Sequence, residues 1–186
     1  MNIGFALCGS FCTYEKVFPI MEALTSEHNV VPIFSFAAGS VDSRFGAAAA
    51  HIARAEEICR QKALKSIPDV EPIGPKRMLD VLLIAPCTGN TLAKLAHSIA
   101  DTPVTMAAKS HLRNGRPVVL GVSTNDGLAG AAENIGKLLG KKPYYFIPFG
   151  QDDPVNKPTS LVADFSLTEK AILAAMEGRQ LQPLLL

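Results

Sequence analysis

The sequence predicts an α/β fold, a doubly wound parallel sheet with helices on both faces. Short apolar runs, typical of buried strands, alternate along the chain with amphipathic segments of helical periodicity. Strands of a parallel sheet are covered on both faces, which is why such runs are continuous rather than alternating. The 186 residues, 48% of them hydrophobic, are enough for one sizeable core. We therefore expect a single domain over residues 1–186, with the loop and helix of residues 150–186 packing on it.

Each element follows from its residues. Five apolar runs are the predicted strands: residues 2–8, 29–37, 80–86, 116–123 and 142–149. The intervening segments are the predicted helices: residues 14–24, 44–64, a helix after the small polar residues 87–91, and residues 102–115, 128–140 and 161–178. The first helix has Val17, Ile20, Met21 and Leu24 on one face. Residues 66–75 contain three prolines and are expected to be a connector.

Composition excludes several classes of protein. A net charge of +1 and a pI near 7.7 give no electrostatic reason to expect nucleic acid or an anionic membrane as partner. The N-terminus lacks the basic region and the apolar length of a signal peptide, and no apolar run is long enough to span a membrane. The four cysteines lack paired C-x-x-C spacing, so we expect no metal site or disulfide, only reduced thiols in a cytoplasm.

The turn after the first strand suits an anion. Gly9 permits a sharp turn, Ser10 and Thr13 offer hydroxyl groups, and the following helix supplies backbone N–H donors. The turn matches neither the dinucleotide fingerprint nor the Walker loop. Ser10 or Thr13 could instead cap the helix, which is the commoner role of such residues. The segment alone does not decide between these two roles.

The stretch LLIAPCTGNTLAKLA, residues 82–96, turns from a strand into a helix through small polar residues. Gly89 admits close approach of a ligand, and Asn90 or Thr91 can cap the helix. In the next strand-end turn, Asn125 offers both a donor and an acceptor, and Asp126 could cap the following helix. The carboxyl ends of parallel strands meet at one edge, so these turns predict a site for a planar polar ligand.

The remaining turns are less specific. The second contains Ser35 and Arg44, which could meet an anion or belong to a plain polar loop. The fifth contains Asp152, Asp153 and Lys157, by default a solvated loop. All four histidines fall in or next to predicted helices, so no catalytic residue is identified. A polar pocket with few acid–base groups indicates dependence on a cofactor or a partner.

Residues 80–105 resemble the APATANTxAKxAxGxAD signature of the flavoprotein family of FMN-binding cysteine decarboxylases and flavin prenyltransferases. The resemblance implies a Rossmann-like flavoprotein fold with FMN phosphate at the Gly9–Ser10 turn. The chain departs from the decarboxylases: Pro72 stands near the position of their histidine, and VSTNDGL keeps only the asparagine of their PxMNxxM element. The implied cofactor-binding residues are Gly9, Ser10, Phe11, Thr13, Ser35, Pro86, Cys87, Thr88, Gly89, Asn90, Thr91 and Asn125.

A narrower resemblance covers almost the whole chain. Residues 42–46, 109–128 and 149–165 are similar to the family of dipicolinate synthase B subunits, with FGQDDPVNKPTSL the most distinctive part. This implies a subunit of an NAD(P)-dependent oxidoreductase in the mother-cell cytoplasm of a sporulating bacterium. Its partner would be the dipicolinate synthase A subunit, which carries the nicotinamide-binding fold.

The implied reaction converts a (hydroxy)tetrahydrodipicolinate intermediate to pyridine-2,6-dicarboxylate. Arg44, Arg116 and Lys157 are the candidate partners of the substrate carboxylates. Relatives imply a homo-oligomer, trimer or dodecamer. The alternatives are a stand-alone FMN-dependent decarboxylase and a non-catalytic scaffold of the A subunit; the cradle itself could hold FMN, the substrate or an anion.

Overall fold

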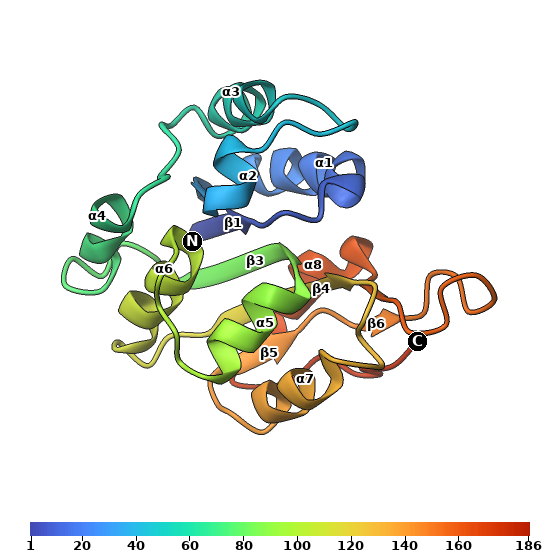
Figure 1. Ribbon diagram of the computed structural model, residues 1–186. Helices are drawn as coiled ribbons and strands as arrows, with labels where there is room; N and C mark the ends of the chain where they lie inside the picture. Colours follow the sequence, from blue (N-terminus) through green and yellow to red (C-terminus); the bar gives the residue numbers. More distant parts are fainter.

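The structure is a computed structural model that describes residues 1–186. Seven strands form one sheet in the order β2-β1-β3-β4-β7-β6, with β5 also paired to β4 (Figure 1). All pairings among the first five strands are parallel, whereas β7 pairs antiparallel with both β4 and β6. The doubly wound α/β fold is therefore confirmed, with a mixed rather than purely parallel sheet. The strands are β1 Asn2–Leu7, β2 Asn29–Phe34, β3 Val81–Cys87, β4 Val118–Thr124, β5 Tyr144–Phe146, β6 Phe149–Gly150 and β7 Leu161–Ala163.

The central strands are buried on both faces, as their continuous apolar runs predict. All seven residues of β3 are buried, and so are the first six of β4. Packing around β1 is so close that a Cβ atom on Gly4 would lie 2.5 Å from Leu79 Cδ1. Only glycine fits there without displacing its neighbours.

Helices cover both faces of the sheet (Figure 1). Helices α1 and α8 both contact the short helix η3 on one face, while α5 contacts α6 and α7 on the other. No helix is both long and apolar enough to cross a membrane. The helices are α1 Tyr14–Thr25, α2 Phe36–Ser40, α3 Ala48–Cys59, α4 Ile67–Val70, α5 Gly89–Ala96, α6 Pro103–Leu112, α7 Ala132–Leu139 and α8 Thr168–Met176, with 3-10 turns η1 Phe11–Thr13, η2 Glu71–Ile73 and η3 Phe165–Leu167.

Several segments differ from the sequence-based expectation. The predicted strand at residues 142–149 is divided into β5 and β6. The connector at residues 66–75 contains α4 and η2, because Ser66 and Asp69 form a capping box that starts a helix despite the prolines. The end of the second predicted strand becomes α2, which Ser35 caps. The last predicted helix, residues 161–178, begins instead with strand β7, and α8 starts only at Thr168. An apolar run as short as Leu161–Ala163 does not distinguish a strand from a helix.

One histidine is part of the core. His111, on α6, has no exposed surface, and its Nε2–H donates to the Pro117 carbonyl oxygen at 3.1 Å. Its Nδ1 has no partner. Burial is the main reason why the pKa of His111 falls to about 4. The folded protein therefore holds this imidazole neutral.

We expect acid to destabilise the fold through His111. Because the folded pKa is depressed, the unfolded chain binds a proton that the folded chain refuses between about pH 6.5 and 4. This should remove about 3 kcal/mol of unfolding free energy over that window, at about 1.4 kcal/mol per pKa unit. Urea unfolding of the wild type and His111→Gln at pH 7 and pH 4.5 measures it. The glutamine amide can still donate to Pro117, so the variant should lose less stability; equal losses would contradict the assignment.

Candidate ligand-binding site

A pocket of about 340 Å³ lies at the carboxyl edge of the sheet, where β1 and β4 end. One wall, the β1 side, comes from the turn after β1 and the start of α1. The opposite wall, the loop side, comes from the loop before β7. The pocket is lined by Gly9, Ser10, Cys12, Thr13 and Lys16 on the β1 side, by Thr88, Ser123, Thr124 and Asn125 between the two walls, and by Asp152, Lys157, Ser160 and Val162 on the loop side.

Two hydroxyl groups meet on the β1 side. The Ser10 and Ser123 Oγ atoms are 2.7 Å apart. Neither Ser10 nor Thr13 caps a helix with its side chain, and Thr13 Oγ1 instead donates to the Ser10 carbonyl oxygen at 2.8 Å. Both residues stand at N-cap positions, but neither side chain makes the capping hydrogen bond that the alternative role requires. The amides of Phe11 and Cys12 donate no hydrogen bond within the protein, so these N–H groups are free to bind an anion.

The turn after β3 contributes one residue to the pocket lining, Thr88. Thr88 is the N-cap of α5 and accepts from the Thr91 amide at 3.3 Å, so Asn90 and Thr91 are not the caps. The Thr91 hydroxyl is buried and donates to Cys8 Sγ at 3.3 Å. These contacts make the turn a rigid support for the pocket.

Gly89 faces protein rather than open space. A Cβ atom there would lie 2.8 Å from both Asp126 Oδ1 and Thr124 Oγ1. Asp126 accepts a hydrogen bond from the Thr124 hydroxyl and does not cap α7, whose N-cap is Ala131. The glycine therefore lets the turns after β3 and β4 approach closely.

Several residues of the predicted cofactor set lie outside the pocket lining. The Ser35 hydroxyl accepts from the Ala38 amide at 3.2 Å and is used as a cap. Pro86 and Cys87 are buried within β3, and Asn90 is exposed on α5. Phe11 packs edge-on against Tyr14, with ring centroids 5.6 Å apart.

Of the three predicted cations, Lys157 alone lines the pocket. Arg116 precedes β4 and therefore lies at the amino edge of the sheet, where it donates to the Leu79 carbonyl oxygen and pairs with Asp80 at 3.3 Å. Arg44 lies over the Phe45 ring, 4.8 Å from its centroid. Arg116 and Arg44 therefore do not line this pocket, contrary to the sequence-based assignment.

Sequence reasoning missed Lys16, which adds a second cation to the lining. It lies on α1, three residues after Thr13, a helical spacing that could have revealed it.

Strand β7 places the loop side against β4. Ser123 pairs with Val162 and Thr124 with Leu161, and the Thr159 hydroxyl donates to the Asn125 carbonyl oxygen at 2.7 Å. The paired residues Ser123 and Val162 both line the pocket, and so do Asn125 and Ser160, each one residue beyond its strand. The antiparallel pairing of β7 with β4 thus adds the loop before β7 to a site formed by the ends of β1, β3 and β4.

A charged pair occupies the loop side. Lys157 Nζ lies 3.4 Å from Asp152 Oδ2, and both side chains are partly exposed. The Ser160 hydroxyl beside the Asp152 carboxylate, and then the Lys157 ammonium, hold the pKa of Asp152 below its usual range. Asp152 is therefore an anion at neutral pH and no proton donor.

The four thiols differ in accessibility. Burial raises the pKa of Cys8 to about 11 and of Cys59 to about 12, and it raises the pKa of Cys87 well above its usual value. Cys12 is exposed, lines the pocket and lies 3.9 Å from Ser10 Oγ. It is the one cysteine classed as exposed, whereas the other three are buried.

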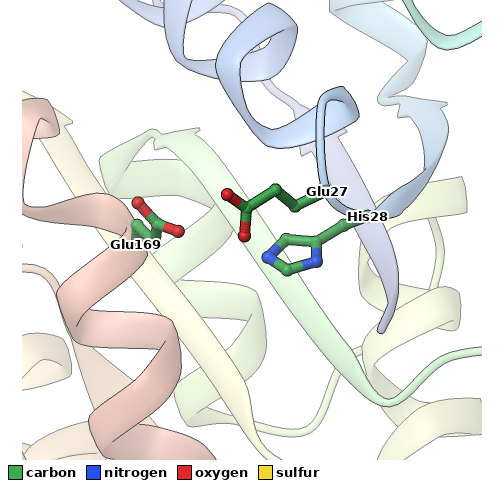
Figure 2. Close-up of side chains that lie close together, drawn as sticks. All are labelled: Glu27, His28 and Glu169. Atoms are coloured by element: carbon green, nitrogen blue, oxygen red, sulfur yellow. The ribbon is translucent and has the colours of Figure 1, made fainter.

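A second group of titratable side chains, Glu27, His28 and Glu169, lies away from the pocket. Figure 2 shows His28 and Glu27, between α1 and β2, opposite Glu169 on α8. Their potential ligand atoms lie within 4.8 Å of one another. Metal-binding histidines normally donate their other ring N–H to a protein acceptor, but His28 Nδ1 is buried without a partner. The two glutamates are exposed, and we assign no metal to this group.

Comparison with known proteins identifies the family. The family model named Flavoprotein matches residues 1–130. The chain belongs to the Flavoprotein family. This match includes the β1 side of the pocket and Asn125, but not the loop side.

Relatives of this flavoprotein chain extend the similarity. It is 48% identical over 185 residues to the dipicolinate synthase B subunit of Bacillus subtilis strain 168, covering 99% of this chain and 92% of the relative. The crystal structure of the dipicolinate synthase B subunit from Bacillus halodurans C is similar with a TM-score of 0.91 and 44% identity, over 100% of this chain and 95% of that one. The FMN-dependent cysteine decarboxylase SpaF shares the fold, with a TM-score of 0.70, 20% identity and coverage of 94% and 97%.

We expect one thiol of the folded protein to react rapidly with a disulfide reagent such as DTNB. Cys12 should react because it is exposed, whereas burial disfavours the thiolate of the other three. The absorbance of the released thiolate should correspond to one reactive thiol per chain in buffer and to four in denaturant. Cys12→Ser should remove the fast equivalent. Any fast equivalent that remains in that variant would show that the buried thiols are accessible.

Proposed function

We propose that this chain acts as the B subunit of a dipicolinate synthase, together with an A subunit that binds NAD(P). The similarity to two such B subunits over nearly the full length of each chain supports this assignment. The observation that carries it is the pocket itself. It combines hydroxyl groups, free amides and two lysines, which suits a small anionic ligand.

The reaction balances with a nicotinamide on the partner. The hydroxytetrahydrodipicolinate ring loses one water, then one hydride to NAD(P)⁺ and one proton, to give the aromatic dicarboxylate. No histidine lines the pocket, and Asp152 is ionised. This chain therefore binds and orients the dianion, using Asn125 as a donor and Lys157 as counter-ion, while the hydride leaves to the nicotinamide of the partner.

The β1 side of the pocket also fits FMN. The Ser10 and Ser123 hydroxyls, the free amides of Phe11 and Cys12, and the Lys16 ammonium are the donors that a phosphate group needs. Thr88 and Asn125 offer hydrogen bonds to the rest of the molecule. When bound, FMN would supply two-electron redox chemistry. We propose the same residues as the cofactor site, in a homo-oligomer that is a trimer or a dodecamer. A dodecameric FMN-dependent decarboxylase from Escherichia coli O157:H7 shares the fold.

We expect the purified chain, mixed with its A subunit, NADP⁺ and the intermediate, to produce pyridine-2,6-dicarboxylate, followed by its ultraviolet absorbance. Ser10→Ala and Asn125→Ala should each lower the rate about tenfold or more, because each removes a hydrogen bond to a charged ligand. Ser26→Ala is the control, since that exposed serine bonds only the Ala23 carbonyl oxygen at the far end of α1.

The same assay with and without added FMN tests the cofactor. A yellow protein, or stimulation by FMN, supports a flavin role. Full activity of Ser10→Ala and Asn125→Ala in the intact complex would instead indicate a scaffold for the A subunit. Carbon dioxide release from a cysteine-type substrate without the partner would indicate a stand-alone decarboxylase.

A further inference from the structure

The loop side of the pocket contains a buried hydroxyl group without a partner. Ser160 has only 1% of its surface exposed, and its Oγ makes no hydrogen bond within the protein, although the Asp152 carboxylate is close enough for the hydroxyl to lower its pKa. Ser160 lines the pocket directly before β7, and Val162 of that strand lines it too. A buried unsatisfied hydroxyl is costly, so such groups are normally paired or face a ligand.

The cation beside Ser160 is only weakly engaged. Lys157 Nζ is 3.4 Å from Asp152 Oδ2, and just over half of the lysine side chain is exposed. An exposed ion pair of this kind contributes little to stability. Lys157 can therefore exchange Asp152 for an incoming anion at low cost.

The backbone holds both groups in place independently of their side chains. The Lys157 amide donates to the Asp153 carbonyl oxygen at 2.8 Å, and the Ser160 amide donates to the Lys157 carbonyl oxygen at 3.0 Å. Thr159 ties the same turn to Asn125. A hydroxyl donor and an ammonium donor are thus presented together on one rigid turn, next to the apolar wall of Val162.

We propose that this turn is a carboxylate subsite, in which the Ser160 hydroxyl donates to a ligand carboxylate and the Lys157 ammonium leaves Asp152 to pair with it. The subsite holds one carboxylate of a cyclic dicarboxylate, and the apolar side of the ring lies toward Val162. Only the identity of that dicarboxylate rests on the proposed function. Asp152 acts as the resident anion, which the ligand displaces.

The test is calorimetric titration of the full chain with benzene-1,3-dicarboxylate and with pyridine-2,6-dicarboxylate. Ser160→Ala and Lys157→Ala should each weaken binding of both probes about tenfold, by loss of a charge-assisted contact. Asp152→Asn should tighten binding, because it removes the competing carboxylate. Weaker binding in Asp152→Asn, or no binding of either probe to the wild type, would overturn the subsite.

Matched variants separate binding from folding. Ser160→Ala removes a hydroxyl whose one interaction is with the Asp152 carboxylate, so it should lower the unfolding free energy less than removal of a hydroxyl that makes two hydrogen bonds. Ser110 is also buried, but its hydroxyl accepts from the Gly74 amide and donates to the Glu71 carbonyl oxygen. Ser110→Ala should therefore lower stability and leave probe affinity unchanged. Lys62→Ala, which removes a surface ion pair with Glu56, is the control for Lys157→Ala.

Two further arms locate the effect. Inorganic phosphate should bind equally to the wild type and Ser160→Ala, because the groups that donate to phosphate lie on the β1 side. If Ser160→Ala loses affinity for phosphate but not for the dicarboxylates, this turn is a phosphate site and the proposal is overturned.

Dipicolinate formation by the wild type with the A subunit is measured separately. If it fails while the probe pattern holds, the subsite stands and the proposed reaction is wrong; unchanged rates and affinities in Ser160→Ala and Lys157→Ala would reject the subsite alone.

Discussion

Along one edge, strand β4 pairs with two different strands, β5 and β7, and the pocket depends on this change of pairing partner. Its first half pairs in parallel with β5, from Val118 to Leu120, and its end pairs antiparallel with β7, at Ser123 and Thr124. Strand β5 ends before Pro148, which has no N–H to continue a ladder. The vacated edge at the end of β4 is what β7 occupies.

This exchange of partners brings together residues far apart in the chain. The β1 turn reaches β4 through the contact of Ser10 with Ser123, and the loop before β7 reaches it through Thr159 and the strand pairing. A parallel sheet alone would have left the end of β4 open on that side. The antiparallel addition closes a polar pocket at an edge where α/β folds usually bind ligands.

The sequence alone predicted the site residues that directly follow a strand. Gly9, Ser10, Thr88 and Asn125 each come directly after an apolar run, and the structure places all four in one pocket. Arg116 precedes its strand, so the same rule should have excluded it. Ser160 could not be found, because the three residues that follow it form a strand too short to show a period. Its burial depends on pairing with β4, a non-local contact that no local pattern reveals.

The groups in this pocket decide what kind of chemistry the chain can contribute. The thiols nearest to the turn after β3, Cys8 and Cys87, are held protonated by burial, and Asp152 is held ionised. General acid–base catalysis at neutral pH needs a group whose pKa lies near that pH, and none of these meets the condition. What remains is a set of fixed hydrogen-bond donors and two lysines, which bind anions and orient them. The proposed reaction therefore requires an electron acceptor other than these side chains, either a bound flavin or a nicotinamide on a partner, because the side chains can bind a substrate but cannot oxidise it.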